Sequence, residues 1–126
     1  MSITQIVTQS PSGQSEFQDT AIGNSATAIK GSSALVLSLV ADNTGNVAAT
    51  YIKLYNLASG SVVVGTTAPD EVIFCPGSVI TTAIFQTGAT AGQTFGTALT
   101  VAAVNSGGTA GTTSPVSNVP LTIVYV

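Results

Sequence analysis

Few residues of this chain could carry out chemistry. The sequence contains no histidine and a single cysteine, Cys75. The absence of histidine excludes a Ser-His triad, histidine-based acid–base catalysis and histidine metal ligands. Cys75 follows the apolar residues 72–74, so we expect a buried and inert thiol. With one cysteine, no disulfide can form within the chain.

Two groups of oxygen-bearing side chains remain. Asp70 and Glu71 are adjacent, but successive side chains of a strand point to opposite faces, so they are not expected to act as a paired acid and base. Asp42, Asn43 and Asn46 share one turn, yet the ligand spacing of an EF-hand calcium loop is missing. No phosphate-binding loop or nucleophile elbow occurs. We therefore predict no catalytic residues, no cofactor and no metal site, and hence not an enzyme.

One stripe of side chains has the pattern of a contact surface. Tyr51, Lys53 and Tyr55 alternate with Ile52 and Leu54, the period of two that places one set in a core and the other outside. The outer set has two interpretations. The tyrosine rings either cover a face of the sheet with their hydroxyl groups in water, or form a contact patch, because tyrosine is enriched at interfaces.

Charge is scarce in this sequence. Charged residues make up 6% of the chain, with two basic and five acidic residues and a net charge of −3. Binding of nucleic acid requires several cations, so we expect no nucleic-acid partner. The longest apolar run, residues 34–41, is too short to span a membrane, and the N-terminus lacks the pattern of a signal peptide. A surface with so few charges favours association with other protein chains.

Short alternating segments separated by turn residues predict an all-β domain over residues 23–126. The expected strands are residues 23–30, 34–41, 48–56, 61–64, 71–75, 78–85, 97–104 and 120–126. Seven to eight such strands are typical of a single antiparallel β-sandwich, either Ig-like or jelly-roll-like. The alternation predicts a core of Leu35, Leu37, Leu39, Ile52, Leu54, Leu99, Val101, Leu121 and Ile123. The long polar loop 105–118 is expected to be flexible and open to contacts.

Residues 1–22 are predicted to form an extended N-terminal arm, because their apolar positions are sparse. The arm either adds a strand to the protein's own sheet or grips a neighbouring chain by strand addition. Under the second hypothesis, removal of residues 2–20 leaves the sandwich folded and abolishes binding. The expected partner interface combines the arm with the tyrosine–lysine stripe: Ile3, Ile6, Val7, Phe17, Tyr51, Lys53 and Tyr55.

Three segments share a pattern with known proteins. They are residues 51–55 (YIKLY), residues 64–69 (VGTTAP) with Pro76 and Gly77 after an apolar strand, and residues 94–99 (TFGTAL) leading into residues 101–105. In this order they resemble a widespread type of small bacteriophage virion protein, over residues 25–126. The sequence departs from that pattern at Ala98, where the family usually has glycine, and in loop 105–118, which lacks the expected acidic residues.

The resemblance implies a non-enzymatic structural protein of a tailed-phage virion, made in the host cytoplasm. It further implies a capsid decoration or cement protein that binds the outside of the shell, with the major capsid protein as its partner and a trimer as its oligomeric state. A tail, neck or fibre-associated protein is the first alternative. A carbohydrate- or receptor-binding module is the second. Such a module favours exposed aromatic residues in loops, whereas this chain has no tryptophan and its tyrosines fall on expected strands.

Overall fold

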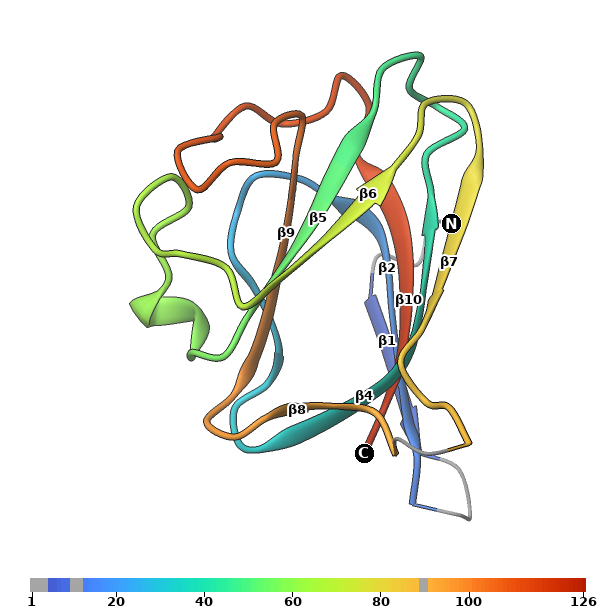
Figure 1. Cartoon of the computed structure of the whole chain (residues 1–126), viewed down its shortest axis with the longest axis vertical. Helices are drawn as coiled ribbons and strands as arrows, with labels where there is room; N and C mark the ends of the chain where they lie inside the picture. The colour runs from blue at the N-terminus through green and yellow to red at the C-terminus, as the bar shows by residue number, and fades with distance from the viewer. Residues whose placement is uncertain (1–4, 10–12, 89–90) are drawn as a thin grey trace.

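Two antiparallel sheets pack face to face in the computed structural model, which describes residues 5–9, 13–88 and 91–126 (Figure 1). The predicted all-β sandwich is therefore confirmed. Its strands are β1 (Gln5–Gln9), β2 (Ser15–Ile22), β3 (Thr27–Lys30), β4 (Ala34–Asp42), β5 (Thr50–Tyr55), β6 (Glu71–Cys75), β7 (Ile80–Ile84), β8 (Gln93–Phe95), β9 (Leu99–Val104) and β10 (Val119–Tyr125). Within the described ranges no helix is long and apolar enough to cross a membrane.

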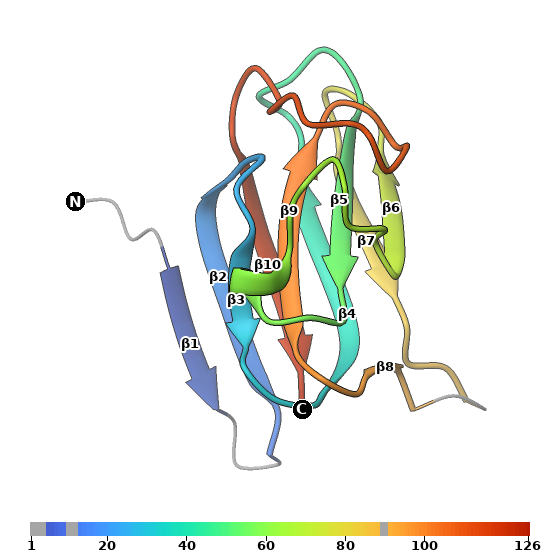
Figure 2. The same cartoon turned by 90° about the vertical axis from the view of Figure 1, so that its left-hand side faces the viewer.

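The strand order places two edge strands on the same side of the sandwich. Sheet A has six strands in the order β1-β2-β10-β4-β7, with β8 also paired to β4. Sheet B has four strands in the order β3-β9-β5-β6. The chain crosses from sheet B to sheet A between β6 and β7. These two strands, each at an edge of its sheet, therefore lie on the same side of the sandwich (Figure 2).

Alternating apolar side chains from both sheets fill the space between them. The strands bury one face each because every second side chain points into this space. Of the predicted core residues, the following lie in the main buried cluster: Leu39, Ile52, Leu54, Leu99, Val101, Leu121 and Ile123.

The alternation of β4 changes at Leu37. The pairing of β4 with β10 shifts register beside this residue, as at a β-bulge, and a bulge moves the following side chains to the opposite face. Val36 and Leu39 therefore both belong to the main cluster. Leu35 is only half-buried, and Leu37 is buried away from that cluster. The prediction that Leu35, Leu37 and Leu39 share one face is wrong, because a period of two in the sequence does not reveal a bulge.

Residues 15–22 are part of the sandwich and not of a separate arm. They form β2, which pairs with β1 on one side and with β10 on the other. Phe17 and Ile22 are each 1% exposed and lie in the core. Two large apolar side chains are enough here because β2 buries only one face. The predicted domain boundary after residue 22 is therefore wrong for this segment.

The backbone of β1 pairs with β2 over its whole length. This agrees with the hypothesis of a strand added to the protein's own sheet. Residues 1–4 and 10–12 lie outside the described part of the chain.

Candidate interaction surface

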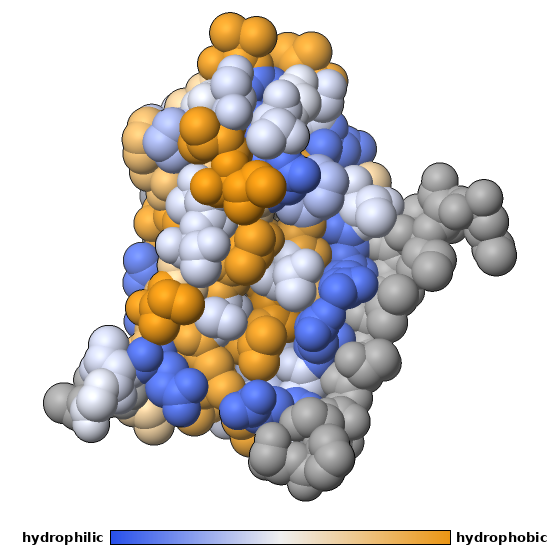
Figure 3. Space-filling view, turned by 90° about the vertical axis from the view of Figure 1, so that its right-hand side faces the viewer, coloured by the Kyte–Doolittle hydropathy of each residue, from blue (hydrophilic) through white to orange (hydrophobic). Residues whose placement is uncertain are grey.

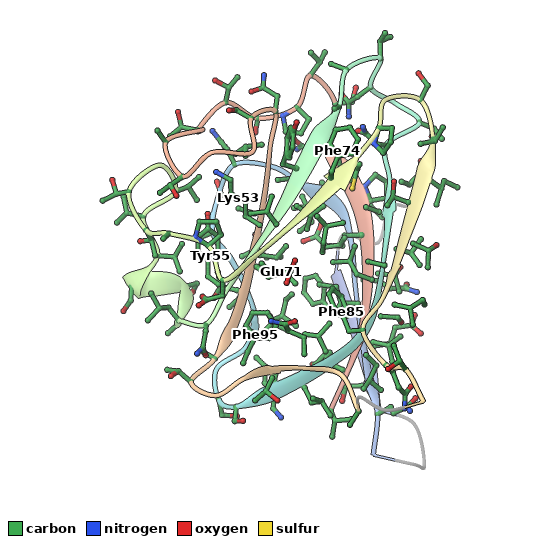
Figure 4. All side chains as sticks on the ribbon, viewed as in Figure 1. Lys53, Tyr55, Glu71, Phe74, Phe85 and Phe95 are labelled. Carbon is green, nitrogen blue, oxygen red and sulfur yellow. The ribbon has the colours of Figure 1, made fainter. Side chains whose placement is uncertain are left out.

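The tyrosine–lysine stripe is covered and not exposed. β5 lies inside sheet B between β9 and β6, with Ile52 and Leu54 in the core. Lys53 and Tyr55 point to the outer face of the sheet, but both are 0% exposed (Figure 4). Residues 56–70 and 105–118 lie over this face and bury them. The prediction that these two residues belong to a partner interface is wrong, because the segment directly after β5 covers Tyr55 and the distant loop 105–118 covers Lys53.

Lys53 fastens loop 105–118 to sheet B. Its ammonium group donates to the carbonyl oxygen of Gly108 at 2.6 Å and to that of Gly111 at 3.2 Å. Burial lowers the pKa of Lys53 below its ordinary value, because the charged form is taken out of water. The two carbonyl groups offset part of that cost, so the lysine acts as a buried hydrogen-bond donor.

Further hydrogen bonds hold the same loop at its other positions. The side-chain amide of Asn24 donates to the Thr112 carbonyl at 2.8 Å. Asn46 donates through Nδ2 to the Ser117 carbonyl at 2.8 Å and accepts from the Ser117 amide at 2.7 Å. Loop 105–118, predicted to be flexible, is therefore held over the outer face of sheet B by these hydrogen bonds.

Tyr55 is the centre of a second, smaller apolar cluster. Its ring packs with Val62 and Ala102. Residues 61–64, predicted as a strand, are not one: Ser61 ends a short 3-10 turn, η1 (Ser59–Ser61), and residues 62–64 follow it. Among the described side chains, the Tyr55 hydroxyl is buried without a hydrogen-bond partner. Burial raises the pKa of this hydroxyl. The cluster is apolar packing with one unsatisfied polar atom.

Tyr51 is also shielded. Its ring lies 5.4 Å from the ring of Phe74, centroid to centroid, at a tilt of 54°. Gly107 lies against the ring, where a Cβ would come within 2.8 Å of it. Tyr51 is half-buried, while Phe74 is 54% exposed. Phe74 is thus the more accessible aromatic side chain of this pair.

The remaining predicted interface residues divide into three groups. Phe17 lies in the core and cannot contact a partner in the folded chain. Ile6 and Val7 lie on β1, where the structure describes their pairing with β2. Ile3 lies outside the described residues.

The residues considered for chemistry have structural partners. Cys75 is a buried free thiol, and burial raises its pKa. Asn43 donates through Nδ2 to the carbonyl groups of Ala48, Cys75 and Pro76, and its Oδ1 accepts from Thr50 at 2.8 Å. Asn43 therefore ties the turn after β4 to the end of β6. No group of three metal-ligating side chains that could hold a metal ion occurs within the described ranges.

Asp70 and Glu71 have different surroundings: Asp70 is exposed and Glu71 is half-buried. Asp70 accepts a hydrogen bond from the Asn56 amide at 2.7 Å. Glu71 lies opposite Leu54, a core residue, and its side chain points toward the space between the sheets, on the side where Phe85 and Phe95 lie (Figure 4). The two carboxylates therefore have different neighbours and do not form a pair.

The outer face of sheet A carries no such cover in the described part of the chain. Since Phe17, Leu39 and Ile123 face the core, the side chains between them face outward. By the strand pairing, this outer face comprises Glu16, Gln18, Ser38, Val40, Asp42, Ile80, Thr82, Ile84, Thr122 and Val124. Figure 3 shows an apolar column along this face, bordered by hydrophilic residues on one side.

The exposed apolar residues of this face lie mainly on β7. Ile80 is 58% exposed and Ile84 is 61% exposed, while Val40 and Val124 are half-buried. The sequence signal was the spacing of Ile80, Thr82 and Ile84. It was missed because a period of two identifies residues that share a face, but not the face that points to solvent.

A second accessible apolar site lies at one end of the sandwich. Residues 45–50 and Asn105, Pro115 and Val116 line a cavity of about 240 Å³. At its rim, Val47 is 93% exposed and Val116 is 98% exposed. The lining is mostly apolar and offers few groups to orient a polar ligand.

Comparison of the chain with protein-family models, curated proteins and solved structures finds no match. The case for a function therefore rests on the residues of the chain and on the geometry described above. Of the surfaces described, the outer face of sheet A is the broadest candidate for contact with a protein.

Proposed function

We propose that the protein is a non-enzymatic structural protein of a bacteriophage virion, which binds the outside of the capsid shell as a decoration or cement protein. The observation that carries the proposal is the outer face of sheet A, which no described residue covers. It combines apolar and hydroxyl side chains, with Glu16 and Asp42 as its charged residues. Interface cores are likewise depleted of charged residues.

The size of this face suits a protein partner. β10 has seven residues, which at about 3.3 Å per residue gives a length of about 23 Å. Four strands about 4.8 Å apart add a width of about 15–19 Å, hence a projected area on the order of 400 Å². Standard interfaces bury about 800 Å² on each partner, counted as accessible surface that includes the relief of the side chains. The face can therefore supply a large share of one specific interface.

Most of the residues that carry the resemblance to phage virion proteins lie away from the outer face of sheet A. Its three segments lie mainly on β5, β6 and β9, which are neighbours in sheet B, and on the turns beside them, while Thr94 and Phe95 lie on β8 of sheet A. Gly77 is required where a Cβ would lie 1.9 Å from the Val47 carbonyl oxygen. Asn56 accepts a hydrogen bond from the Thr97 amide at 2.7 Å, and Lys53 holds the covering loop. The shared residues thus have structural reasons, which supports a common scaffold and leaves the binding face free to differ.

The proposed partner is the major capsid protein, and the protein would reside in the virion after synthesis in the host cytoplasm. The trimer implied by the resemblance, at a symmetry point of the capsid, stays a prediction about the particle-bound protein. A tail, neck or fibre position is the alternative within the same class. In either position the face of sheet A would contact the particle.

Imaging of particles tests this proposal. We would compare, by electron cryo-microscopy, particles of the encoding phage with particles from a strain that lacks the gene. The proposal expects density for a small sandwich on the outer shell of the first particles alone. Density only at the tail or neck would favour the alternative position there over the capsid shell. Particles without any difference would refute a structural role in the virion.

A further inference from the structure

Edge strands expose unpaired backbone groups, which native proteins usually protect with charges, prolines, bulges or short length. β3 is four residues long, ends at Lys30 and pairs with β9 through a register shift. β6 lies between Pro69 and Pro76 and carries Glu71, whose side chain turns toward the inner side. Both of these edges are protected against pairing with another chain.

β7 lacks each of these devices. It has five residues, ITTAI, with neither a charge nor a proline. Its pairing with β4 runs without a register shift. Ile80 and Ile84 are 58% and 61% exposed. β8 continues this edge along β4, but it is only three residues long. Among the edge strands whose side chains the structure describes, β7 is therefore the one open to strand addition.

The backbone hydrogen bonds show which groups of β7 face the open edge. The Val79 carbonyl accepts from the Asn43 amide at 3.0 Å, and the Phe85 amide donates to the Leu37 carbonyl at 2.9 Å. Successive residues of an antiparallel strand direct their backbone groups to alternate sides. The odd-numbered residues therefore bond to β4, and the even-numbered residues direct their amide and carbonyl groups away from it.

We propose that this edge pairs with the same edge of a second copy of the chain, antiparallel, about a two-fold axis at Thr82. In this register Thr82 faces its own counterpart, and Ile80 faces the counterpart of Ile84. Each facing pair of even-numbered residues can exchange two backbone hydrogen bonds, giving about six in all. Sheet A then continues from one copy into the other.

A second copy fits this edge because the strand is nearly the same read in either direction. A two-fold axis requires residue 80 to suit residue 84, and both are isoleucine. On the outer face, isoleucine then packs on isoleucine at each side of a pair of threonine hydroxyl groups. On the inner face Thr81 meets the counterpart of Ala83. No charge is placed at the contact, so the edge is self-complementary.

The pairing stands apart from the proposed role in the virion, since it concerns this chain alone. A strand of five residues is about 17 Å long, and its contact is smaller than the standard interface of about 800 Å² per partner. We therefore expect a weak association, populated only at high protein concentration. Crowding of copies on a surface would raise their local concentration and populate the pair.

Sedimentation equilibrium of the purified full chain, from about 5 to about 500 μM, tests the pairing. The expected result is a monomer–dimer equilibrium. Thr82→Lys and Thr82→Glu each place like charges across the axis, and each variant should weaken the dimer at least tenfold. Thr109→Lys, at an exposed position of loop 105–118, makes the same change of charge elsewhere and should leave association unchanged.

Mixing the two Thr82 variants tests the register itself. The introduced ammonium of one copy would face the introduced carboxylate of the other, so the mixture should recover a heterodimer that neither variant forms alone. Circular dichroism of each variant checks that the sandwich is folded, which is expected because the Thr82 side chain is exposed. Monomer at every concentration, a trimer in place of a dimer, or no recovery in the mixture would overturn the proposal.

Discussion

The outer faces of the two sheets follow the same alternation of side chains but differ in what lies over them. On sheet B, Lys53, Tyr55 and Ala102 are 0% exposed beneath residues 56–70 and 105–118. On sheet A, Ile80 and Ile84 remain 58% and 61% exposed, without a cover in the described part of the chain. Burial of the first face contributes to stability, whereas the second face stays available for binding.

This difference reverses what residue types alone suggest. The tyrosines and the lysine of β5 have the composition of a contact patch, yet they hold the covering loops in place. The valines, isoleucines and threonines of sheet A have the composition of ordinary strands, yet they form the accessible face. Whether an outward side chain is exposed is decided by the loops that pack over the sheet, which the period of two does not reveal.

The largest expected effect concerns β2, which forms part of sheet A and of its outer face. Deletion of residues 2–20 removes β1 and most of β2, including Phe17, and leaves β10 unpaired on one side. We expect loss of cooperative thermal unfolding, because removal of one buried Phe alone costs about 3–5 kcal/mol. Circular dichroism melting of the truncated chain measures this. A truncated chain that melts like the full chain would show that residues 2–20 are an appendage after all.

Tyr55→Ala tests the covered face next. The ring packs with Val62 and Ala102, so its removal should lower the free energy of unfolding by about 3–5 kcal/mol. A substitution on the open face, Val124→Ala, should cost about 1 kcal/mol or less. Urea denaturation of both variants gives the two values. Equal losses would mean that the two faces are covered alike.

Lys53→Met keeps much of the aliphatic stem and removes the ammonium group. Loss of its hydrogen bonds to Gly108 and Gly111 should cost about 1.5–3 kcal/mol, less whatever is recovered by no longer burying a charge. Hydrogen exchange should become faster in residues 105–118. Lys30→Met, at the protected edge β3, is the control and should change neither quantity. Unchanged exchange in the loop would disprove the fastening role.

Tyr55→Phe has the smallest expected effect. The hydroxyl is buried without a partner among the described side chains, so its removal should leave stability unchanged or raise it by about 1 kcal/mol. Thermal unfolding of this variant beside the wild type measures the change. A clear loss of stability would indicate that the hydroxyl has a partner, such as water.

The sequence predicts the sandwich because alternation in β5, β9 and β10 marks the core residues directly. It does not predict β2, because Phe17 and Ile22 are too widely spaced to show a period among polar neighbours. The bulge at Leu37 is hidden for a related reason, since it is defined by pairing with β10. The covering of Lys53 depends on contacts with residues more than fifty positions away, which no local pattern contains.

The most direct test of the account is the binding of face variants to particles that lack the protein. Val40→Lys combined with Val124→Lys places two charges on the outer face of sheet A. Val63→Lys combined with Val116→Lys places the same charges at valines that are 59% and 98% exposed elsewhere. We predict that the first variant, folded by circular dichroism, binds at least tenfold more weakly, and that the second binds like the wild type. Wild-type affinity of the first variant would contradict the assignment of this face as the binding surface.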